Sequence, residues 1–369
     1  MKLLSLCPLY QNGGASRLLR RLYEGRESQI ITLAIRANSI KPQKGKISEI
    51  DLPIYPLQQK WMRWKFRSIS TYLRDEFFFN YNSKRILNTV KKIEFDTIHV
   101  INHGVYCNSF YDKKYLDNKK IWVSFHDHYR LCSSVEDAKF LWNIADRRLV
   151  ISEDLAKEYE KTFGKKKYEI ITDGVDIAEL SVPVKSNPKV PQIIYFAGLL
   201  HIDYYSLFKV LADALDLMSI EEKRFKLILR GTQELPLLTN RKFEVEYRKN
   251  FITDIEIKEE LDQAAILYLP IKFSSPDFYL YSLSTKLVSY LGGSGAILYH
   301  GPEDAVACNL LKKNNAAGIC ITLNVNDLVT QIKNTLEKTI EISEAAIKLV
   351  NHSFDLTVIQ KRFWEIDKL

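Results

Sequence analysis

The sequence has too few and too scattered cysteines to build a disulfide framework or a zinc site. Its 369 residues include only Cys7, Cys107, Cys132, Cys308 and Cys320, with no CxxC pair among them. An odd, unclustered set of this kind is typical of reduced thiols in the cytoplasm. We therefore expect a cytoplasmic protein with no disulfide framework and no zinc site. We also expect it to hold no cofactor.

Long hydrophobic runs are also missing. The N-terminal residues MKLLSLCPLYQNGG carry too short an apolar run for a signal peptide and no small-residue cleavage site, so we expect no secretory signal there. No apolar run approaches the length that crosses a bilayer. Internal repeats and low-complexity tracts are absent as well, and 46% of the residues are hydrophobic. A chain of this length and composition is expected to form two domains, each with its own core.

The turn after the first expected strand lacks the glycine pattern of a dinucleotide site. Residues 2–7, KLLSLC, form a short and mainly apolar strand, residues 12–16 read NGGAS, and Leu18, Leu19 and Leu22 then recur on one face of a helix. The turn is not G-x-G-x-x-G and no acidic residue follows at the required distance, which excludes a nicotinamide site. Strand, glycine turn and helix in this order nevertheless predict a doubly wound α/β domain. The other interpretation of the glycines is a tight turn that binds nothing.

The charge balance is basic, with a net charge of +8 and a pI of about 9.0. Such a balance favours an acidic partner, which is nucleic acid, anionic lipid or a phosphorylated small molecule. Residues 58–85 concentrate the pattern, because aromatic residues such as Trp61 and Phe77 alternate there with cations such as Lys65 and Arg67. Basic and aromatic residues together suit an anionic membrane surface, and they also suit nucleic acid. A third interpretation is a helix packed in the core with a basic outer face.

Residues 282–299, SLSTKLVSYLGGSGAILY, predict a loop, a helix, a glycine turn and a buried strand. Ser284 and Thr285 are suited to cap the helix, because their hydroxyls accept hydrogen bonds from its first free amides. Lys286 adds a mobile cation beside them. Free amides and a cation at the end of a buried sheet form an anion site. The alternative is an ordinary αβ unit of a parallel sheet.

The same segment resembles a motif of GT-B glycosyltransferases. STKLVSYLGGSGAIL is similar to P-x-K-L-x-E-Y-L-A-x-G-x-P-V-V in the large retaining family, family 4-like, which serves bacterial polysaccharide and lipopolysaccharide synthesis. In that family the segment holds the nucleotide-sugar donor, so the resemblance implies donor binding by Ser284, Thr285, Lys286 and Ser289. Ser289 stands where the family has the glutamate that grips the donor ribose.

Two further segments of the first half resemble the same family. VSFHDHYRLC is similar to its strand-then-histidine segment, which implies that His126 faces the donor sugar and takes part in catalysis. The remaining interpretations of HDH are a metal pair, which we discount because the residues are too close together, and a structural histidine. The family also implies that the loop with Gly13 and Gly14 lies over the acceptor and the donor phosphate. Residues 152–176 resemble the S-E-x-L … I-x-N-G-V-D run, with Asp173 in place of asparagine.

Segments in the second half of the chain resemble the same family more weakly. A strand at 192–196 ends in Ala197-Gly198, and the resemblance implies that Gly198 contacts the donor. Many family members have an arginine at the position after this glycine, which is occupied by Leu199 here. The position of the lysine that follows in those members corresponds roughly to Asp203. The strand at 225–229 ends in Arg230-Gly231, near the nucleotide in the family, so we expect Arg230 to supply the missing positive charge.

The sequence thus predicts an α/β protein with the GT-B architecture, in which two doubly wound Rossmann-like domains face a cleft. We expect an acceptor-binding domain at 1–182, a donor-binding domain at 190–352, and a terminal helix at 353–369 that crosses back to the first domain. The resemblance implies metal-independent, retaining transfer of a sugar from a UDP- or GDP-sugar to a glycan or lipid-linked acceptor, in the cytoplasm or peripherally on the membrane through residues 58–85. A non-catalytic glycosyltransferase-like binding subunit and, with less support, a nucleic-acid-binding protein are the alternatives; we expect no nucleic acid as partner.

Overall fold

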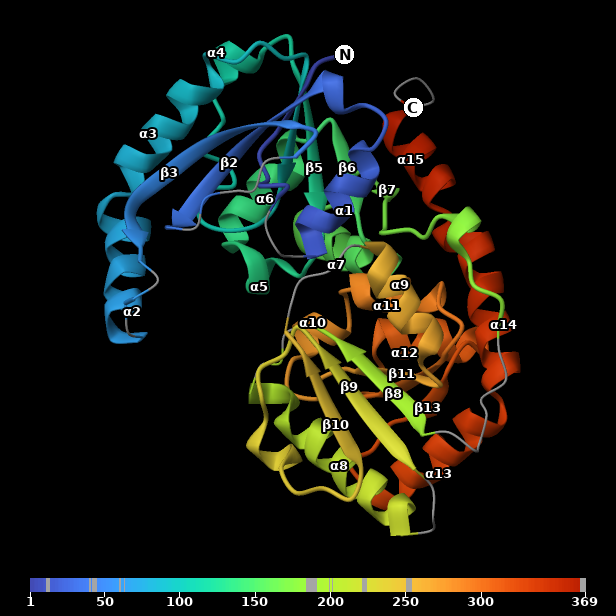
Figure 1. Cartoon of the computed structure of the whole chain (residues 1–369). Helices are drawn as coiled ribbons and strands as arrows, with labels where there is room; N and C mark the ends of the chain where they lie inside the picture. Colours follow the sequence, from blue (N-terminus) through green and yellow to red (C-terminus); the bar gives the residue numbers. More distant parts are fainter. Residues whose placement is uncertain are drawn as a thin grey trace. The chain divides into compact units, whose positions relative to one another are not determined.

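The computed structural model divides into two compact units (Figure 1). It describes residues 1–365 except 11–13, 40, 42–44, 60, 63, 184–190, 199, 201, 221–223 and 250–253. The first unit is Met1–Thr172 together with the chain from Gln360 onward, and the second unit is Asp173–Ile359. Residues 184–190, near the junction of the two expected domains, lie outside the described residues, and Ser181–Pro183 belong to the second unit.

The first unit is built on a seven-stranded parallel sheet with the strand order β3-β2-β1-β4-β5-β6-β7. Its strands are β1 Leu3–Ser5, β2 Ile30–Asn38, β3 Ser48–Gln58, β4 Thr97–Ile101, β5 Lys120–Phe125, β6 Arg147–Val150 and β7 Glu169–Ile170. Its helices are α1 Gly14–Tyr23, α2 Trp64–Tyr72, α3 Phe79–Val90, α4 Lys113–Leu116, α5 Tyr129–Cys132, α6 Val135–Ile144 and α7 Glu153–Phe163. The order reverses between β1 and β4, as in other doubly wound sheets.

Alternation along β5 explains why helices cover both faces of this sheet. Trp122 and Phe125 are three residues apart and therefore point to opposite faces. The Phe125 ring packs on Trp142 of α6 and Tyr159 of α7, with ring centroids 5.3 and 4.8 Å away. All three rings are fully buried, so this face is closed by aromatic packing.

The Trp122 face is closed by the end of helix α15, Leu356–Trp364. The Phe363 ring centroid lies 5.4 Å from that of Trp122 and 5.9 Å from that of Tyr23 on α1. Arg147 on β6 donates to the Phe363 carbonyl at 2.8 Å and pairs with Glu169 on β7. The last part of the chain therefore completes the core of the first unit, which confirms the predicted return of the terminal helix.

The second unit is built on a six-stranded parallel sheet with the order β10-β9-β8-β11-β12-β13. Its strands are β8 Gln192–Ala197, β9 Phe225–Arg230, β10 Glu244–Arg248, β11 Ile266–Pro270, β12 Ala296–His300 and β13 Gly318–Cys320. Its helices are α8 Tyr205–Ile220, α9 Asp254–Gln263, α10 Pro276–Tyr279, α11 Thr285–Leu291, α12 Val306–Lys313, α13 Val325–Glu337, α14 Thr339–Leu349 and the start of α15. Here the order reverses between β8 and β11.

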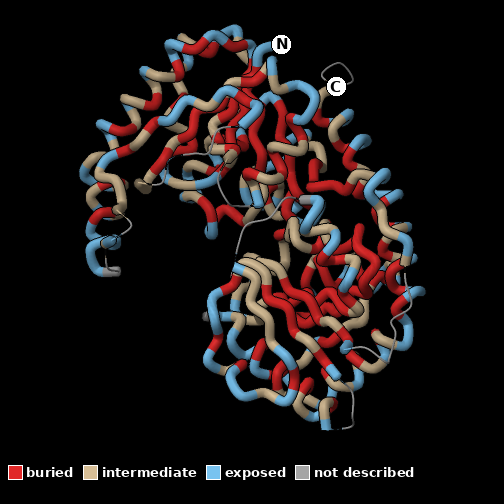
Figure 2. Tube along the Cα trace, viewed as in Figure 1, coloured by how far each residue is buried: buried red, intermediate tan, exposed pale blue. Residues whose placement is uncertain are grey.

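The two faces of this second sheet also have separate cores. On β8, Phe196 points to the core that α8 and α13 share, whereas Tyr195 points to the core formed with α9, α11, α12 and α14. Figure 2 shows buried residues along the strands and exposed residues along the outer sides of the helices. The near-continuous apolar runs of β8, β11 and β12 follow from this two-sided burial.

Residues 58–85 do not form the core-packed helix that was one of the three interpretations. They form the end of β3, helix α2, a π-helical turn at Leu73–Phe77 and the start of α3. Phe66, Tyr72 and Phe77 remain 57%, 66% and 75% exposed. No helix in the described part of the chain has the length and apolar character needed to cross a membrane.

The aromatic packing of α15 generates a stability prediction for the first unit. Phe363 is fully buried, so Phe363→Ala should lower the free energy of unfolding of this unit by about 3–5 kcal/mol. Urea unfolding followed by tryptophan fluorescence measures this change. Lys361→Ala, on the exposed side of the same helix, is the control and should change it by no more than about 0.5 kcal/mol. Equal effects of the two substitutions would contradict the packing described above.

Candidate functional site

In the first unit, several polar residues gather where adjacent strands end. Parallel strands bring their carboxyl ends to one edge of the sheet, and ligands of such sheets bind at that edge near the point where the strand order reverses. Here the reversal lies between β1 and β4, and β5 is the neighbour of β4. Of the predicted N-terminal loop, Gly13 lies outside the described residues, and Gly14 is the first residue of α1.

His126 directly follows β5 and is half-buried. Burial, with a smaller contribution from His103, lowers the pKa of its imidazole to about 4, although Asp127 acts in the opposite direction. The ring is therefore neutral at physiological pH. No hydrogen bond joins it to another residue of the described chain, so both ring nitrogens are available to a ligand. A neutral imidazole can donate to and accept from sugar hydroxyl groups.

His128 has a structural role, which separates it from His126. Its Nδ1 atom accepts a hydrogen bond from the Arg130 amide at 3.4 Å at the start of α5, and its ring packs on Tyr129 with centroids 4.1 Å apart. The side chain is 2% exposed. Of the two histidines in the HDH segment, only His126 has the exposure that a ligand contact requires.

Asn102 and His103, which follow β4, belong to the same edge and were missed by the sequence analysis. The Asn102 amide nitrogen donates to the Tyr159 hydroxyl at 2.9 Å, while its buried Oδ1 atom has no hydrogen-bond partner among the described residues. A signal was present, because the apolar run of β4 ends abruptly in Asn-His-Gly. His103 is exposed and therefore joins His126 as a residue that a ligand at this edge would meet, whereas Asn102 is only 1% exposed.

In the second unit, Gly198 and Lys286 come together at the end of β8, next to the reversal between β8 and β11. Gly198 has a φ of +134°, which favours glycine. A Cβ atom at this position would lie 3.1 Å from the Lys286 Nζ atom. The missing side chain therefore leaves room for the ammonium group beside the backbone at this strand end.

Lys286 is not the mobile surface cation that the sequence suggested. Its side chain is half-buried, and its Nζ atom lies 3.7 Å from the centroid of the Phe196 ring. Burial lowers the pKa of the ammonium to about 7. Removal from water disfavours the charged form, and among the residues that the structure describes no carboxylate compensates for this loss. A bound anion would supply the missing negative charge, so this lysine is suited to bind one.

Helix α11 is fixed to β8 by its own side chains. Ser284 caps it as predicted, accepting from the Lys286 amide at 3.2 Å. Tyr290, one turn after Lys286, accepts a hydrogen bond from the Ala197 amide at 3.0 Å. The Ser289 hydroxyl donates to the Thr285 carbonyl at 3.0 Å, along the helix. Thr285, Lys286 and Ser289 are therefore held on one short helix whose orientation is set by β8.

Arg230 and Gly231 stand beside Gly198, because the Gly198 amide donates to the Arg230 carbonyl at 2.9 Å. The Arg230 guanidinium, however, forms an ion pair with Glu260 on α9. Glu260 also accepts from the Tyr195 hydroxyl and from Arg248, both at 2.7 Å. The charge of Arg230 is thus largely balanced by protein, and its contribution to a diphosphate site stays a prediction. Sequence patterns gave no indication of this pairing.

Comparison with solved structures finds the same fold in known proteins. Sucrose-phosphate synthase from Thermosynechococcus elongatus is 12% identical with a TM-score of 0.67, over 98% of this chain and 97% of that chain. HepE from Anabaena, solved in complex with UDP and glucose, is 13% identical with a TM-score of 0.66, over 98% of both chains. A glycosyltransferase from Rickettsia africae is 15% identical with a TM-score of 0.67, over 99% and 97%.

No family model and no curated protein matches the sequence. The structural likeness nevertheless covers nearly the whole of each chain and includes both parallel sheets. The predicted fold class is therefore confirmed: this chain has the GT-B fold, and the glycosyltransferases named above are proteins to which it is similar.

Proposed function

We propose that this protein is a glycosyltransferase that moves a sugar from a nucleotide-sugar donor to a glycan or lipid-linked acceptor. The observation that carries the proposal is the desolvated Lys286 beside Gly198, at the end of β8 in a GT-B second unit. Solved structures of the same fold bind UDP and UDP-glucose, which supports a nucleotide-sugar as the donor.

Lys286 would hold the donor diphosphate. Charge builds up on the diphosphate as the bond to the sugar breaks, and a cation already in position stabilises that charge without reorganising. The pKa of Lys286 rises towards its ordinary value when an anion is near, so the lysine becomes fully charged only in the complex. The backbone beside Gly198 and Gly231 would complete the site, with Ser284 and Thr285 at the start of α11.

His126 would hold the transferred sugar. Its neutral ring can form hydrogen bonds that strengthen as the sugar acquires positive character, and it would not add a repelling charge. We propose that transfer proceeds with retention and without a metal, and that the acceptor binds near the loop of Gly13 and Gly14. The first unit would thus recognise sugar and acceptor, and the second would recognise the nucleotide.

A second candidate is a catalytically inactive binding subunit. The specific observations in its favour are Ser289 at the position of the ribose-binding glutamate and the pairing of Arg230 with Glu260. Thermal-shift measurements with UDP and GDP test the first step of either function, because a ligand that binds the native state raises the melting temperature. Binding with no sugar transfer would favour the binding subunit, and stabilisation by neither nucleotide would contradict the transferase.

The assignment of His126 predicts a large catalytic defect. His126→Ala should lower kcat/KM for sugar transfer by about 10²–10³, which is typical when one positioned polar group is lost. Because the pKa of His126 is about 4, its charge should not change between pH 6 and 9, and the wild-type pH profile should show no step from it. The structural His128→Ala variant is the comparison for folding effects, and circular dichroism checks both. Near-normal turnover by a folded His126→Ala protein would exclude the assignment.

The lowered pKa of Lys286 predicts that diphosphate binding takes up a proton. With a pKa of about 7 the lysine is mostly neutral at pH 8, and a bound anion raises that pKa, so UDP binding at pH 8 should take up nearly one proton, about 0.9. At pH 6 the lysine is already charged and the uptake should vanish. Calorimetry in buffers with different ionisation enthalpies measures this difference.

Two variants control that measurement. Lys286→Met should abolish the uptake at pH 8 and weaken UDP binding by about tenfold or more, since a hydrogen bond to a charged group contributes about 1.5–3 kcal/mol. Lys209→Met on the exposed side of α8 should change neither quantity. Equal proton uptake by the wild type and Lys286→Met would show that another group titrates.

Ser289 predicts weak recognition of the donor ribose. The Ser289 side chain, whose hydroxyl donates to the Thr285 carbonyl, is shorter than a glutamate side chain and is uncharged. Ser289→Glu should therefore tighten UDP binding by about tenfold or more, by the 1.5–3 kcal/mol of a charge-assisted hydrogen bond. The gain should be lost with 2′-deoxy-UDP, and calorimetry on both proteins with both ligands measures it. A wild type that already binds tightly and discriminates against the 2′-deoxy ligand would contradict the alignment of this segment.

A further inference from the structure

Helix α2, the residues just before it, the turn after it and the start of α3 present a group of exposed apolar side chains. Six residues are more than half exposed: Trp61 76%, Phe66 57%, Ile69 55%, Tyr72 66%, Phe77 75% and Tyr81 55%. Single exposed apolar residues are common, but a run of this kind within 21 positions is not, and such patches mark interaction sites. We call these six residues the α2 patch.

The α2 patch stands at one end of the first unit. All side chains from Lys65 to Ile69 are exposed, and the next residue, Ser70, is the first buried one. A helix that lies flat on a sheet buries a residue in every turn. The first turns of α2 therefore extend past the edge strand β3, as Figure 1 and Figure 2 show.

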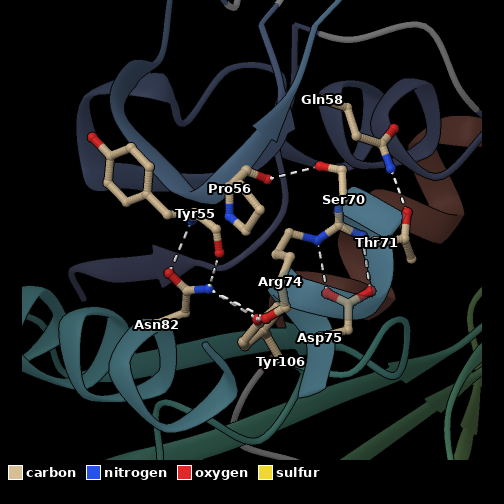
Figure 3. Close-up of polar contacts among 9 residues, drawn as sticks. All are labelled: Tyr55, Pro56, Gln58, Ser70, Thr71, Arg74, Asp75, Asn82 and Tyr106. Carbon is tan, nitrogen blue, oxygen red and sulfur yellow. Dashed lines mark hydrogen bonds and ion pairs between the residues drawn. The ribbon is translucent and has the colours of Figure 1, made fainter. Parts of the chain in front are cut away.

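A buried polar network fixes the base of this projection to β3 (Figure 3). The Asn82 side chain bonds both backbone groups of Tyr55, accepting from its amide at 3.0 Å and donating to its carbonyl at 2.7 Å. It also donates to the Tyr106 hydroxyl at 3.1 Å, and that hydroxyl donates to the Arg74 carbonyl at 2.5 Å. Asn82 is fully buried. These bonds hold the π-helical turn against β3 and α3.

Two further contacts tie α2 itself to the same strand. The Gln58 amide donates to the Thr71 hydroxyl at 2.5 Å, and the Ser70 hydroxyl donates to the Pro56 carbonyl at 3.5 Å. The buried Arg74 guanidinium donates two hydrogen bonds to the Asp75 carboxylate and neutralises its negative charge. The projection is thus a fixed element of the unit, and its exposed residues are displayed in a defined orientation.

The charge around the α2 patch is positive. Lys65, Arg67 and Lys84 are exposed in the same segment, and Arg85 stacks over the Tyr55 and Tyr81 rings at 4.9 and 5.7 Å. Residues 58–85 contain seven lysines and arginines and two acidic residues, a net charge of +5 by subtraction. Of the two acidic residues in this segment, Asp75 forms an ion pair with Arg74. An occupant of this surface is therefore expected to be negatively charged.

We propose that the α2 patch is a docking surface for an anionic lipid bilayer. Its side chains would insert into one face of the bilayer, and the chain would not cross the membrane. Phenylalanine and isoleucine enter the acyl region, tyrosine and tryptophan remain among the headgroups, and lysine and arginine meet lipid phosphates. A second copy of the chain would bring the same segment, with its net charge of +5, against this one, and the two would repel each other. Nucleic acid offers no apolar phase for Phe66 and Ile69. This docking is independent of sugar transfer and would place the first unit at the surface where lipid-linked molecules reside.

Co-sedimentation of the full chain with vesicles tests the proposal. We expect binding to phosphatidylcholine vesicles that contain phosphatidylglycerol, little binding to phosphatidylcholine alone, and a weakening as salt rises. Lys65→Gln with Arg67→Gln should weaken binding by about 30-fold, since each basic residue near an anionic surface contributes about fivefold. Lys165→Gln with Lys166→Gln, in the exposed loop after α7, is the matched control and should change it by no more than about threefold.

The apolar contribution is tested separately. Phe66→Ser with Phe77→Ser should reduce vesicle binding by at least about tenfold and should leave the melting temperature unchanged, because both side chains are exposed. Leu217→Ser with Ile220→Ser on α8 removes two exposed apolar residues elsewhere and should have no effect on binding. Calorimetry with UDP on the same variants keeps a failure of the donor site distinct from a failure of docking.

Four results would overturn the proposal. The first is equal binding to neutral and anionic vesicles, or none to either, and the second is an equal loss in the control variants. The third is a dimer in lipid-free solution that Phe66→Ser with Phe77→Ser dissociates, since the patch would then bind a second copy. Displacement of vesicles by excess single-stranded DNA that leaves a stable protein–DNA complex would instead assign the surface to nucleic acid.

Discussion

The packing of α11 against the end of β8 determines what the second unit is able to bind. Tyr290 reaches the Ala197 amide, which draws the helix onto the strand and leaves Lys286 against the Phe196 ring. An ammonium group in that position has lost water without gaining a carboxylate from the described part of the chain, so its charged form is costly in the absence of an anion. The absence of a side chain at Gly198 is the second requirement, because any Cβ atom there would crowd the ammonium. The anion binding that we propose for this unit would therefore follow from local packing rather than from an excess of positive charge.

Much of the architecture could be predicted because it depends on short-range patterns. The apolar runs that became β4, β5, β8, β11 and β12 and the Ser284 cap are readable from consecutive residues, whereas the return of the terminal helix was implied by the resemblance to GT-B enzymes. The environment of the site residues could not be predicted in the same way. Glu260 neutralises Arg230 from a position 30 residues away on α9, and no sequence pattern specifies which carboxylate faces a given arginine. The burial of Lys286 likewise depends on how closely a short helix approaches a strand.

The α2 patch shows where pattern and packing disagree. Aromatic residues at helical spacing usually enter a core. The composition of residues 58–85 alone therefore does not distinguish a core-packed helix from an exposed one. The structure decides it through polar groups that carry no hydrophobic signal. Asn82 occupies the interior position next to β3 and bonds the Tyr55 backbone, so the anchoring contact is made by an amide and the rings are left outside. Residues that look structural, such as Asn82 and Gln58, thus determine which other residues are exposed.

The first unit is discontinuous, and this affects the order in which the chain can fold during synthesis. The face of its sheet that carries His99 and Trp122 is closed by Phe363, which is translated after the entire second unit, Asp173–Ile359. Domains generally fold as they emerge from the ribosome. The second unit therefore has its own sequence complete while the first still exposes an aromatic surface of tyrosine, histidine and tryptophan. During that interval the nascent first unit is the part of the chain most in need of protection from aggregation.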